Sequence, residues 1–295
     1  MICPLQQIPN GYGKYQNVFA KRLDLIKPGG GNKVFRFQQF FKEHKNIKTL
    51  VALSNPGAHT FHILQALIPS PSPVGEGDIK FLFLEQEMPT NPYTEARRNL
   101  YLNKEGIKVI QAPFWKLLLQ FLYYKYFGGS QYTTIGIGGH IDLKNSNPYE
   151  SVFKECIEQT PLLTSPQRRE EERQVIHLFP IASGNMADCF LALIPKEDQK
   201  HYLAGVTTGG KRTFSYLNFK YGSNKNLSLY KPLEYSYKTY TEKAKLFYEK
   251  TNFYLDPTHT IHLLDVLDQE LLPKDASIVL WITCPLVEKL YENSL

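Results

Sequence analysis

Residues 49–67 read TLVALSNPGAHTFHILQAL: an apolar run of strand length, a polar turn, and a second apolar run with helical spacing. Leaving a buried strand through Ser54 and Asn55, then re-entering apolar sequence beyond Pro56-Gly57, is typical of a strand-to-helix connection in an α/β protein. In such proteins the carboxyl ends of the strands are also where ligands bind. The stretch therefore predicts an α/β fold and leaves two interpretations of the turn open, a plain connection or a ligand-binding loop.

The same alternation of strand-length and helix-period runs continues along the chain. Strands are expected at 49–53, 79–84, 107–111, 133–137, 175–179 and 277–282. Helices are expected at 34–44, 59–67, 94–105, 114–127, 152–159, 186–193, 241–250 and 261–271, with 114–127 buried. Alternating elements of this kind predict an α/β architecture with mainly parallel, twisted sheets.

Composition narrows the class of protein. The 295 residues carry 34 Lys and Arg against 28 Asp and Glu, which is a mild net charge of +6. The four cysteines have no CxxC pair and no Cys/His ligand spacing, so we expect no structural zinc site and a reducing compartment. The opening MICPLQQIPN has no secretory signal, and 114–127 is too short and too charged to span a bilayer. We therefore expect a soluble, cytoplasmic protein without a membrane partner.

A glycine-rich loop near the start of the chain could carry chemistry. Gly29-Gly30-Gly31-Asn32-Lys33 precedes a helical stretch, so its backbone can approach a ligand closely, with Lys33 at the helix start. The lysine could anchor an aldehyde cofactor or a phosphate. Equally, the glycines could form a flexible turn beside a solvated lysine.

Two later loops also enter helices. The loop Ala182-Ser183-Gly184-Asn185 could bind an anion through its backbone N–H groups. Alternatively, Asn185 and Asp188 could form a capping box at the start of the helix. The negative charge of Asp188 would repel a phosphate. Residues 256–262, DPTHTIH, contain two histidines but no third partner at ligand spacing, so we expect no metal there.

The order of these segments along the chain resembles that of one known family. Five segments are similar in type and order to motifs of the fold type II pyridoxal-phosphate enzymes: Arg22-Leu23-Asp24, Gly31-Asn32-Lys33, Ser54-Asn55, the loop 182–185 and Asp256–Thr260. Within that class, the chain is most similar to the 1-aminocyclopropane-1-carboxylate deaminase and D-cysteine desulfhydrase group. The resemblance runs over nearly the whole sequence.

The resemblance implies a fold, a cofactor and a reaction class. It implies two open α/β domains of the tryptophan synthase β-like type, a smaller one at 46–136 and a larger, cofactor-binding one at 1–45 plus 137–295. It implies pyridoxal 5'-phosphate as cofactor and a lyase or deaminase reaction on a small amino acid. It also implies a homodimer, without nucleic acid as a partner.

The same resemblance gives each site residue a role. It implies that Lys33 forms the internal aldimine, that Asn55 holds the cofactor's ring oxygen, and that Ser54 faces the substrate. By the same likeness, Ala182, Ser183, Gly184 and Asn185 would hold the phosphate, Tyr237 would line the substrate pocket, and Thr283 would face the pyridine nitrogen. A neutral hydroxyl at that nitrogen favours β-elimination over reactions that need a long-lived carbanion.

Two other functions stay open. The sequence departs from the family pattern at His259, Ile261, His262, Cys284 and Pro285. These departures favour a catalytically silent binder or interaction subunit on the same scaffold, which the retained Lys33 and Asn55 oppose. Residues 216–250 hold seven tyrosines and seven lysines, which suits nucleic-acid binding or, more simply, half-buried tyrosines beside solvated lysines.

Overall fold

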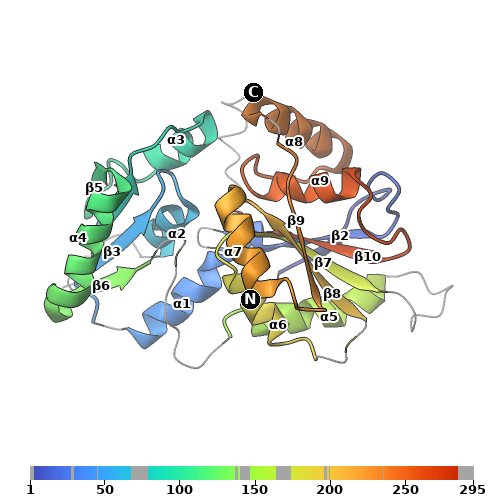
Figure 1. Cartoon of the computed structure of the whole chain (residues 1–295), viewed down its shortest axis with the longest axis horizontal. Helices are drawn as coiled ribbons and strands as arrows, with labels where there is room; N and C mark the ends of the chain where they lie inside the picture. The colour runs from blue at the N-terminus through green and yellow to red at the C-terminus, as the bar shows by residue number, and fades with distance from the viewer. Residues whose placement is uncertain are drawn as a thin grey trace. The chain divides into compact units, whose positions relative to one another are not determined.

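The structure, a computed structural model of the 295-residue chain, describes residues 3–27, 30–44, 46–67, 79–136, 139, 147–163, 174–195, 198, 200–234 and 236–284. Its contacts divide the chain into two compact units, both drawn in Figure 1. Unit 1 consists of Met1–Ile26 with Asn147–Leu286, and unit 2 of Lys27–Ser146 with Val287–Leu295. This division groups 27–45 and 137–146 with unit 2, whereas the boundaries expected from the sequence are 46 and 136.

Unit 2 is built on a four-stranded parallel sheet with the order β5-β4-β3-β6. Its strands are β3 (Thr49–Ser54), β4 (Lys80–Gln86), β5 (Ile107–Ala112) and β6 (Tyr132–Ile135). Its helices are α1 (Lys33–Glu43), α2 (His59–Leu67), α3 (Pro92–Asn99) and α4 (Phe114–Phe127), with a 3₁₀ turn η2 (Gly129–Gln131). Helices cover both faces of the sheet, which explains why β3 and β4 are continuous apolar runs instead of alternating ones.

The two faces of this sheet pack against different helices. On one face α4 joins a buried cluster of Val51, Leu53, Leu82, Leu84, Leu117 and Phe121. On the other face Phe61 of α2 stacks on Phe83 of β4, with ring centroids 4.3 Å apart. Because residues two apart on a strand point to the same side, Leu82 and Leu84 face α4 while Phe83 faces α2.

Helix α4 is much less buried than its sequence predicts. Of its 14 residues, Leu117 and Phe121 are buried, and most of the large apolar side chains on its outer face are exposed. The expectation that 114–127 is a buried helix is therefore wrong, because the sheet covers only one side of it. No helix within the described residues is long and apolar enough to cross a membrane.

Unit 1 is built on a six-stranded sheet with the order β1-β2-β10-β7-β8-β9. Its strands are β1 (Leu5–Gln7), β2 (Val18–Arg22), β7 (Val175–Ile181), β8 (His201–Thr207), β9 (Leu227–Tyr230) and β10 (Ser277–Ile282). β1 runs antiparallel to β2, and the other neighbours are parallel. The last strand in chain order, β10, thus lies between β2 and β7.

The helices of unit 1 lie on both faces of this sheet. They are α5 (Glu150–Leu163), α6 (Asn185–Leu191), α7 (Lys211–Tyr221), α8 (Tyr237–Thr251) and α9 (Leu263–Asp268), with 3₁₀ turns η1 (Leu23–Leu25) and η5 (Thr260–His262). In Figure 1, α5 and α6 lie on one side of the strands and α8 and α9 on the other. Two mainly parallel sheets covered by helices confirm the α/β fold class expected from the sequence.

A hydrogen-bonded pair of histidines lies in the core of unit 1. The indole N–H of Trp281 donates to Nδ1 of His177 at 3.3 Å, so Nε2 of His177 carries the proton and donates to Nδ1 of His201 at 3.1 Å. Burial, followed by the charge of His201, lowers the pKa of His177 well below its usual value. Burial also lowers the pKa of His201, against the opposing charge of Asp198. Both imidazoles are therefore neutral in the folded protein at neutral pH.

We expect the free energy of unfolding to fall as the pH drops below about 6.5, the ordinary pKa of histidine. Both folded pKa values are depressed, so the unfolded chain binds protons that the core excludes, and stability is lost progressively as the pH falls. Urea unfolding on either side of about pH 6.5 measures the loss. His201→Gln should remove part of this loss, with His44→Gln, at an exposed histidine, as the matched control. An undiminished loss in His201→Gln would contradict this account.

Candidate active site

Two predicted parts of the site lie at one edge of the unit 1 sheet. Thr283 directly follows β10, and the loop 182–185 directly follows β7. These strands are parallel neighbours, with Leu280 opposite Leu178, so both segments leave the sheet at its carboxyl edge. Thr283 is buried there, with its Oγ1 4.0 Å from Sγ of Cys284. This edge is where parallel α/β sheets bind ligands.

Gly184 determines the shape of the loop. It has a φ of +83°, and a Cβ at this position would lie 2.4 Å from the Tyr221 hydroxyl oxygen. That hydroxyl donates to the Gly184 carbonyl at 3.0 Å, so α7 holds the loop from one side. A residue with a side chain would be strained here and would collide with Tyr221, which explains the glycine.

The rest of the loop is more open. Ala182 and Ser183 are exposed, and Nδ2 of Asn185 donates to Oγ of Ser183 at 2.9 Å. Gly184 stands at the N-cap of α6 and no side chain caps this helix, so the alternative of a capping box with Asn185 and Asp188 is wrong. Ala182 and Ser183 are thus the solvent-exposed part of the loop, while Gly184 is buried.

The negative charge of Asp188 is offset by two neighbours on α7. Lys220 Nζ donates to Oδ2 of Asp188 at 2.6 Å, and the Tyr221 hydroxyl approaches Oδ1 at 2.7 Å. Burial and then the bond to Asp188 raise the pKa of Tyr221, so it keeps its proton and remains a donor. Pairing with Lys220 weakens the repulsion that Asp188 would exert on an anion at the loop.

Lys33 is the first residue of α1 in unit 2, and its side chain is half-buried. A Cβ added to Gly139, which has a φ of +78°, would lie 3.4 Å from Cδ of Lys33 and 3.3 Å from Oγ1 of Thr60. The lysine stem therefore lies alongside a bare glycine backbone at the start of α2. Thr60 is fully buried, and its hydroxyl has no hydrogen-bond partner within the described residues. Such a group is costly unless a ligand or water satisfies it.

The turn after β3 is anchored to α3. Ser54 is buried at the strand end, and Asn55 is exposed. Gly57 has a φ of +60° and donates its N–H to the Tyr101 hydroxyl at 2.8 Å. A Cβ on Gly57 would lie 2.2 Å from the carbonyl oxygen of Thr94, so the glycine packs directly on α3. This packing leaves Asn55 on the open side of the turn.

A buried carboxylate holds the residue that anchors this turn. Glu85 is fully buried at the end of β4; it accepts a short hydrogen bond from the Tyr101 hydroxyl and another from Nε of Arg98 at 2.8 Å. Burial and then the charge of Glu85 raise the pKa of Tyr101, which therefore stays protonated. Hydrogen bonds from Arg98 to Glu85, from Tyr101 to Glu85 and from Gly57 to Tyr101 therefore hold the turn in place.

Asp256 organises the late turn of unit 1. Its Oδ1 accepts from the backbone N–H of His259 at 2.8 Å, and its Oδ2 accepts from the hydroxyl of Thr260 at 2.5 Å. Burial alone would raise the pKa of Asp256, but the charge of His259 and the hydrogen bonds from Thr258 and Thr260 outweigh it and lower the pKa below its usual range. This carboxylate therefore stabilises the backbone of the turn that leads into η5.

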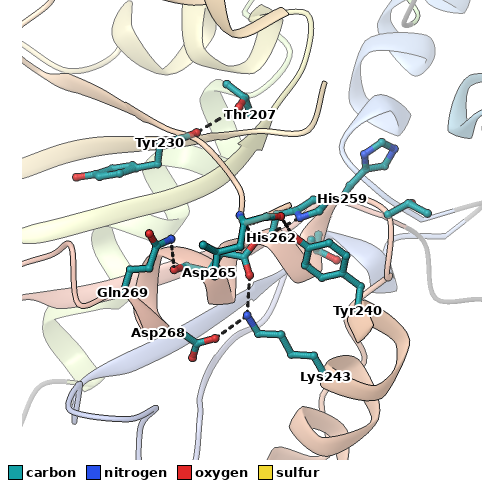
Figure 2. A network of polar contacts seen from close by, with 12 residues as sticks. Thr207, Tyr230, Tyr240, Lys243, His259, His262, Asp265, Asp268 and Gln269 are labelled. Carbon is teal, nitrogen blue, oxygen red and sulfur yellow. Dashed lines mark hydrogen bonds and ion pairs between the residues drawn. The ribbon is translucent and has the colours of Figure 1, made fainter. Parts of the chain in front are cut away.

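A second polar network joins α8 to α9 (Figure 2). Buried Asp265 accepts from Lys243 Nζ at 2.6 Å and from the Tyr240 hydroxyl at 2.9 Å. Figure 2 shows Lys243 between Asp265 and Asp268, which is also 2.6 Å away. Burial would raise the pKa of Asp265, but hydrogen bonds from His262, Lys243 and Tyr240 lower it. Tyr240 is thus part of the core, while Tyr237, three residues earlier, is half-buried at the start of α8.

Comparison with solved structures identifies the fold. A structure described as an ACC deaminase homologue covers 100% of this chain and 92% of its own, with a TM-score of 0.68 and 14% identity. A pyridoxal 5'-phosphate-dependent aspartate racemase covers 97% of this chain and 90% of its own, with a TM-score of 0.59 and 12% identity. The chain has the fold of the fold type II pyridoxal-phosphate enzymes.

A third similar structure is that of a lyase. Escherichia coli diaminopropionate ammonia lyase, solved in complex with an aminoacrylate-PLP azomethine intermediate, covers 99% of this chain and 87% of its own, with a TM-score of 0.61 and 11% identity. No protein-family model and no curated protein matches the chain. At these identities the likeness is one of fold.

On this fold type II scaffold, three residues of interest were not predicted from the sequence. Thr60 could have been predicted, since it is a polar residue at the start of an apolar helix, directly after the turn 54–58. Lys220 and Tyr221 had none, because they lie 32 and 33 residues from Asp188 and only the tertiary fold brings them together.

Proposed function

We propose that this protein is a pyridoxal 5'-phosphate-dependent enzyme that acts on a small amino acid as a lyase or deaminase. The fold supports the cofactor class, since the racemase and the ammonia lyase described above use it. The observation that carries the proposal is the position of Lys33, whose stem lies against the bare backbone of Gly139 and beside the unsatisfied hydroxyl of Thr60. A half-buried lysine beside a buried hydroxyl that has no hydrogen-bond partner among the described residues suits a polar ligand.

The residues of unit 2 would bind the reactive end of the cofactor. Lys33 would be bonded to the aldehyde carbon through its amine, and Asn55, on the exposed side of the turn, would donate to the ring oxygen. Ser54 would assist substrate binding from the strand end. The buried hydroxyl of Thr60 would hydrogen-bond to the bound ligand, which removes the free-energy cost of leaving this hydroxyl without a partner.

The residues of unit 1 would bind the other polar groups. Ala182, Ser183, Gly184 and Asn185 would hold the phosphate through backbone N–H groups, in a loop whose carboxylate neighbour is already paired with a lysine. Thr283, buried at the adjacent strand end, would face the pyridine nitrogen. Tyr237 would line the substrate pocket.

When bound, the cofactor supplies an electron sink for the substrate's α carbon. The chain itself must then move a proton. Once displaced by the substrate amine, Lys33 would be the general base at that carbon, which requires its neutral form, although free lysine has a pKa near 10.4. Desolvation in a closed site is the general means by which a lysine amine is made neutral, because it penalises the charged form.

Borohydride reduction tests this proposal. Purified protein loaded with pyridoxal phosphate is expected to show a visible absorption band that disappears on reduction, and peptide mass mapping should then find the pyridoxyl group on Lys33. A protein that stays colourless with excess cofactor would instead support a silent binder on the same scaffold.

The lysine that pairs with Asp188 gives a further prediction. Lys220→Met is expected to weaken cofactor binding up to about fivefold, because it leaves Asp188 unpaired near the phosphate loop, and the pair is half-exposed. Adding Asp188→Asn to Lys220→Met should restore the affinity. Titration of apoprotein with pyridoxal phosphate, followed by absorbance, measures both; a double variant as weak as the single one would show that charge at Asp188 has no role.

A further inference from the structure

Helix α3 buries an arginine whose charge is not paired. Arg97 is 3% exposed, and its Nε and Nη1 have no hydrogen-bond partner in the part of the chain that the structure describes. In contrast, Nη2 of Arg22 lies 2.7 Å from Oδ2 of Asp24, and Nε of Arg98 lies 2.8 Å from Oε2 of Glu85. A buried charge is costly unless a counter-charge and hydrogen bonds satisfy it, so Arg97 is expected to meet an anion from outside the chain.

Two carboxylates near Arg97 are already engaged. Glu95 accepts a short hydrogen bond from the Thr90 hydroxyl, and its Oε2 lies 3.9 Å from Nη1 of Arg98. Glu85 accepts from Arg98 and from the Tyr101 hydroxyl. Both carboxylates therefore compensate the charge of Arg98, and neither bonds to Arg97.

Arg97 lies on the side of α3 that packs on the turn 54–58. A Cβ on Gly57 would lie 2.8 Å from Cγ2 of Thr94, and the Gly57 N–H donates to the Tyr101 hydroxyl at 2.8 Å. Residues three or four apart lie on the same side of a helix, and position 97 comes three residues after the first contact and four before the second. The arginine is thus placed between the two contacts that hold the turn.

The side chain of Arg97 reaches toward the N-terminal end of α3. Its Cζ is 4.6 Å from the ring centroid of Tyr93, one turn earlier in the helix. α3 follows β4 after the short loop 87–91, and β4 is a parallel neighbour of β3. The N-terminal end of α3 and the turn 54–58 therefore lie at the same carboxyl edge of the unit 2 sheet, which is the edge where α/β sheets bind ligands.

We propose that Arg97 binds the side-chain carboxylate of the substrate, so that the site takes acidic amino acids. The inference rests on the proposed function, in which Ser54 assists substrate binding. The α-carboxylate, present in every amino acid, would be bound at Ser54, which leaves Arg97 for a second acidic group. The planar guanidinium presents its N–H donors in a fixed fork that matches a carboxylate, and stacking on Tyr93 holds its plane.

The same arrangement discriminates against neutral substrates. An amide or an apolar side chain in place of the carboxylate would leave the charge of Arg97 buried without a counter-charge. Sites that contain buried polar groups reject ligands that leave these groups unpaired. The preference for an acid therefore follows from the cost of the empty pairing as much as from the new hydrogen bonds.

Titration of the cofactor-loaded protein with acidic amino acids and their amides tests the inference. At least one of aspartate and glutamate is expected to shift the visible absorption band at roughly 10–100-fold lower concentration than its amide, the usual effect of a hydrogen bond to a charged group. Arg97→Met should remove this preference by weakening the binding of the acid, while the binding of the amide stays unchanged. Arg212→Met, at an exposed arginine on α7, is the matched control and should keep the preference of wild type.

A second measurement needs no cofactor. Succinate, a probe with two carboxylates, should raise the thermal midpoint of the apoprotein more than succinamate, in which an amide replaces one carboxylate, and more than inorganic phosphate. In Arg97→Met the effect of succinate should fall to that of succinamate. Without any ligand, Arg97→Met should have a thermal midpoint equal to or above that of wild type, because an apolar side chain replaces a buried charge. A purely structural arginine would instead make the variant less stable.

Four results would overturn the inference. They are equal affinity for the acids and the amides in wild type, an unchanged preference in Arg97→Met, a lower thermal midpoint of that variant without ligand, and phosphate that stabilises the apoprotein as much as succinate does. Failure of the proposed function is distinguishable from these results. In that case no visible band forms with the cofactor, whereas the succinate measurement still decides whether Arg97 binds a carboxylate.

Discussion

Replacing Lys33 with Ala is expected to abolish the borohydride-stable cofactor adduct and to lower turnover about 10²–10⁴-fold, the usual contribution of a positioned general base. The variant lacks the amine that would bond to the cofactor, while Thr60 and the loop 182–185 keep their positions. It should therefore still take up pyridoxal phosphate, without the covalent bond. Retained but reversible binding separates this result from a folding defect.

The matched control is on the same helix. Lys42 is exposed near the end of α1, so Lys42→Ala should keep the adduct and the activity of wild type. Mass mapping after reduction measures the adduct, and release of ammonia or of a keto acid from candidate amino acids measures turnover. An undiminished adduct in Lys33→Ala, carried by another lysine, would place the chemistry elsewhere in the chain.

Gly57→Ala is expected to lower the free energy of unfolding by about 2–5 kcal/mol. A residue with a Cβ in the left-handed region costs about 1–2 kcal/mol. Overlap with a fixed backbone atom adds about 1–3 kcal/mol, and the new methyl group would lie 2.2 Å from the carbonyl oxygen of Thr94. Urea denaturation measures the loss, and any relief of the clash must move the turn that carries Asn55.

Gly129→Ala separates the two contributions. Gly129 has a φ of +68°, close to that of Gly57, but a Cβ there would meet nothing within 4 Å. Its substitution should therefore cost only about 1–2 kcal/mol, the conformational part. Equal losses in the two variants would mean that the contact with α3 contributes nothing to stability.

Local patterns in the sequence predicted many elements well. The helix expected at 114–127 is α4 (Phe114–Phe127), and the strand expected at 49–53 is β3 (Thr49–Ser54), because each apolar run has the length and period of its element. The helix expected at 94–105 is α3 (Pro92–Asn99) instead. Its start was readable, since Asn91 caps it by accepting from the N–H of Thr94 at 2.9 Å and a proline follows.

Elements whose character depends on distant partners were missed. β2 (Val18–Arg22) contains Lys21, which is fully buried because Glu155 and the carbonyl of Cys3 accept from its Nζ at 2.8 and 2.6 Å. A buried lysine of this kind makes the sequence of a core strand look like that of an exposed segment. β8 begins with His201, which is buried against His177 from β7, and β1, β9 and α7 also lacked a clear period.

Local sequence singled out part of the proposed site. Glycines before a helix singled out Lys33, and a polar turn after a strand singled out Ser54-Asn55. The pairing of Asp188 with Lys220 was not predictable, because it depends on where α7 packs against α6. The exposure of α4 was missed for the same reason, since an apolar sequence does not reveal how many of its sides the fold covers.

The position of β10 at the centre of the unit 1 sheet has a consequence for biosynthesis. The parallel strands of unit 2 are complete once residue 135 has been translated, so this sheet can form on the nascent chain. β2 and β7, in contrast, are joined only through β10, which ends at residue 282. A ribosome that stops before it has translated β10 therefore releases a chain with one finished sheet and, in the other unit, two unjoined groups of strands with exposed edges.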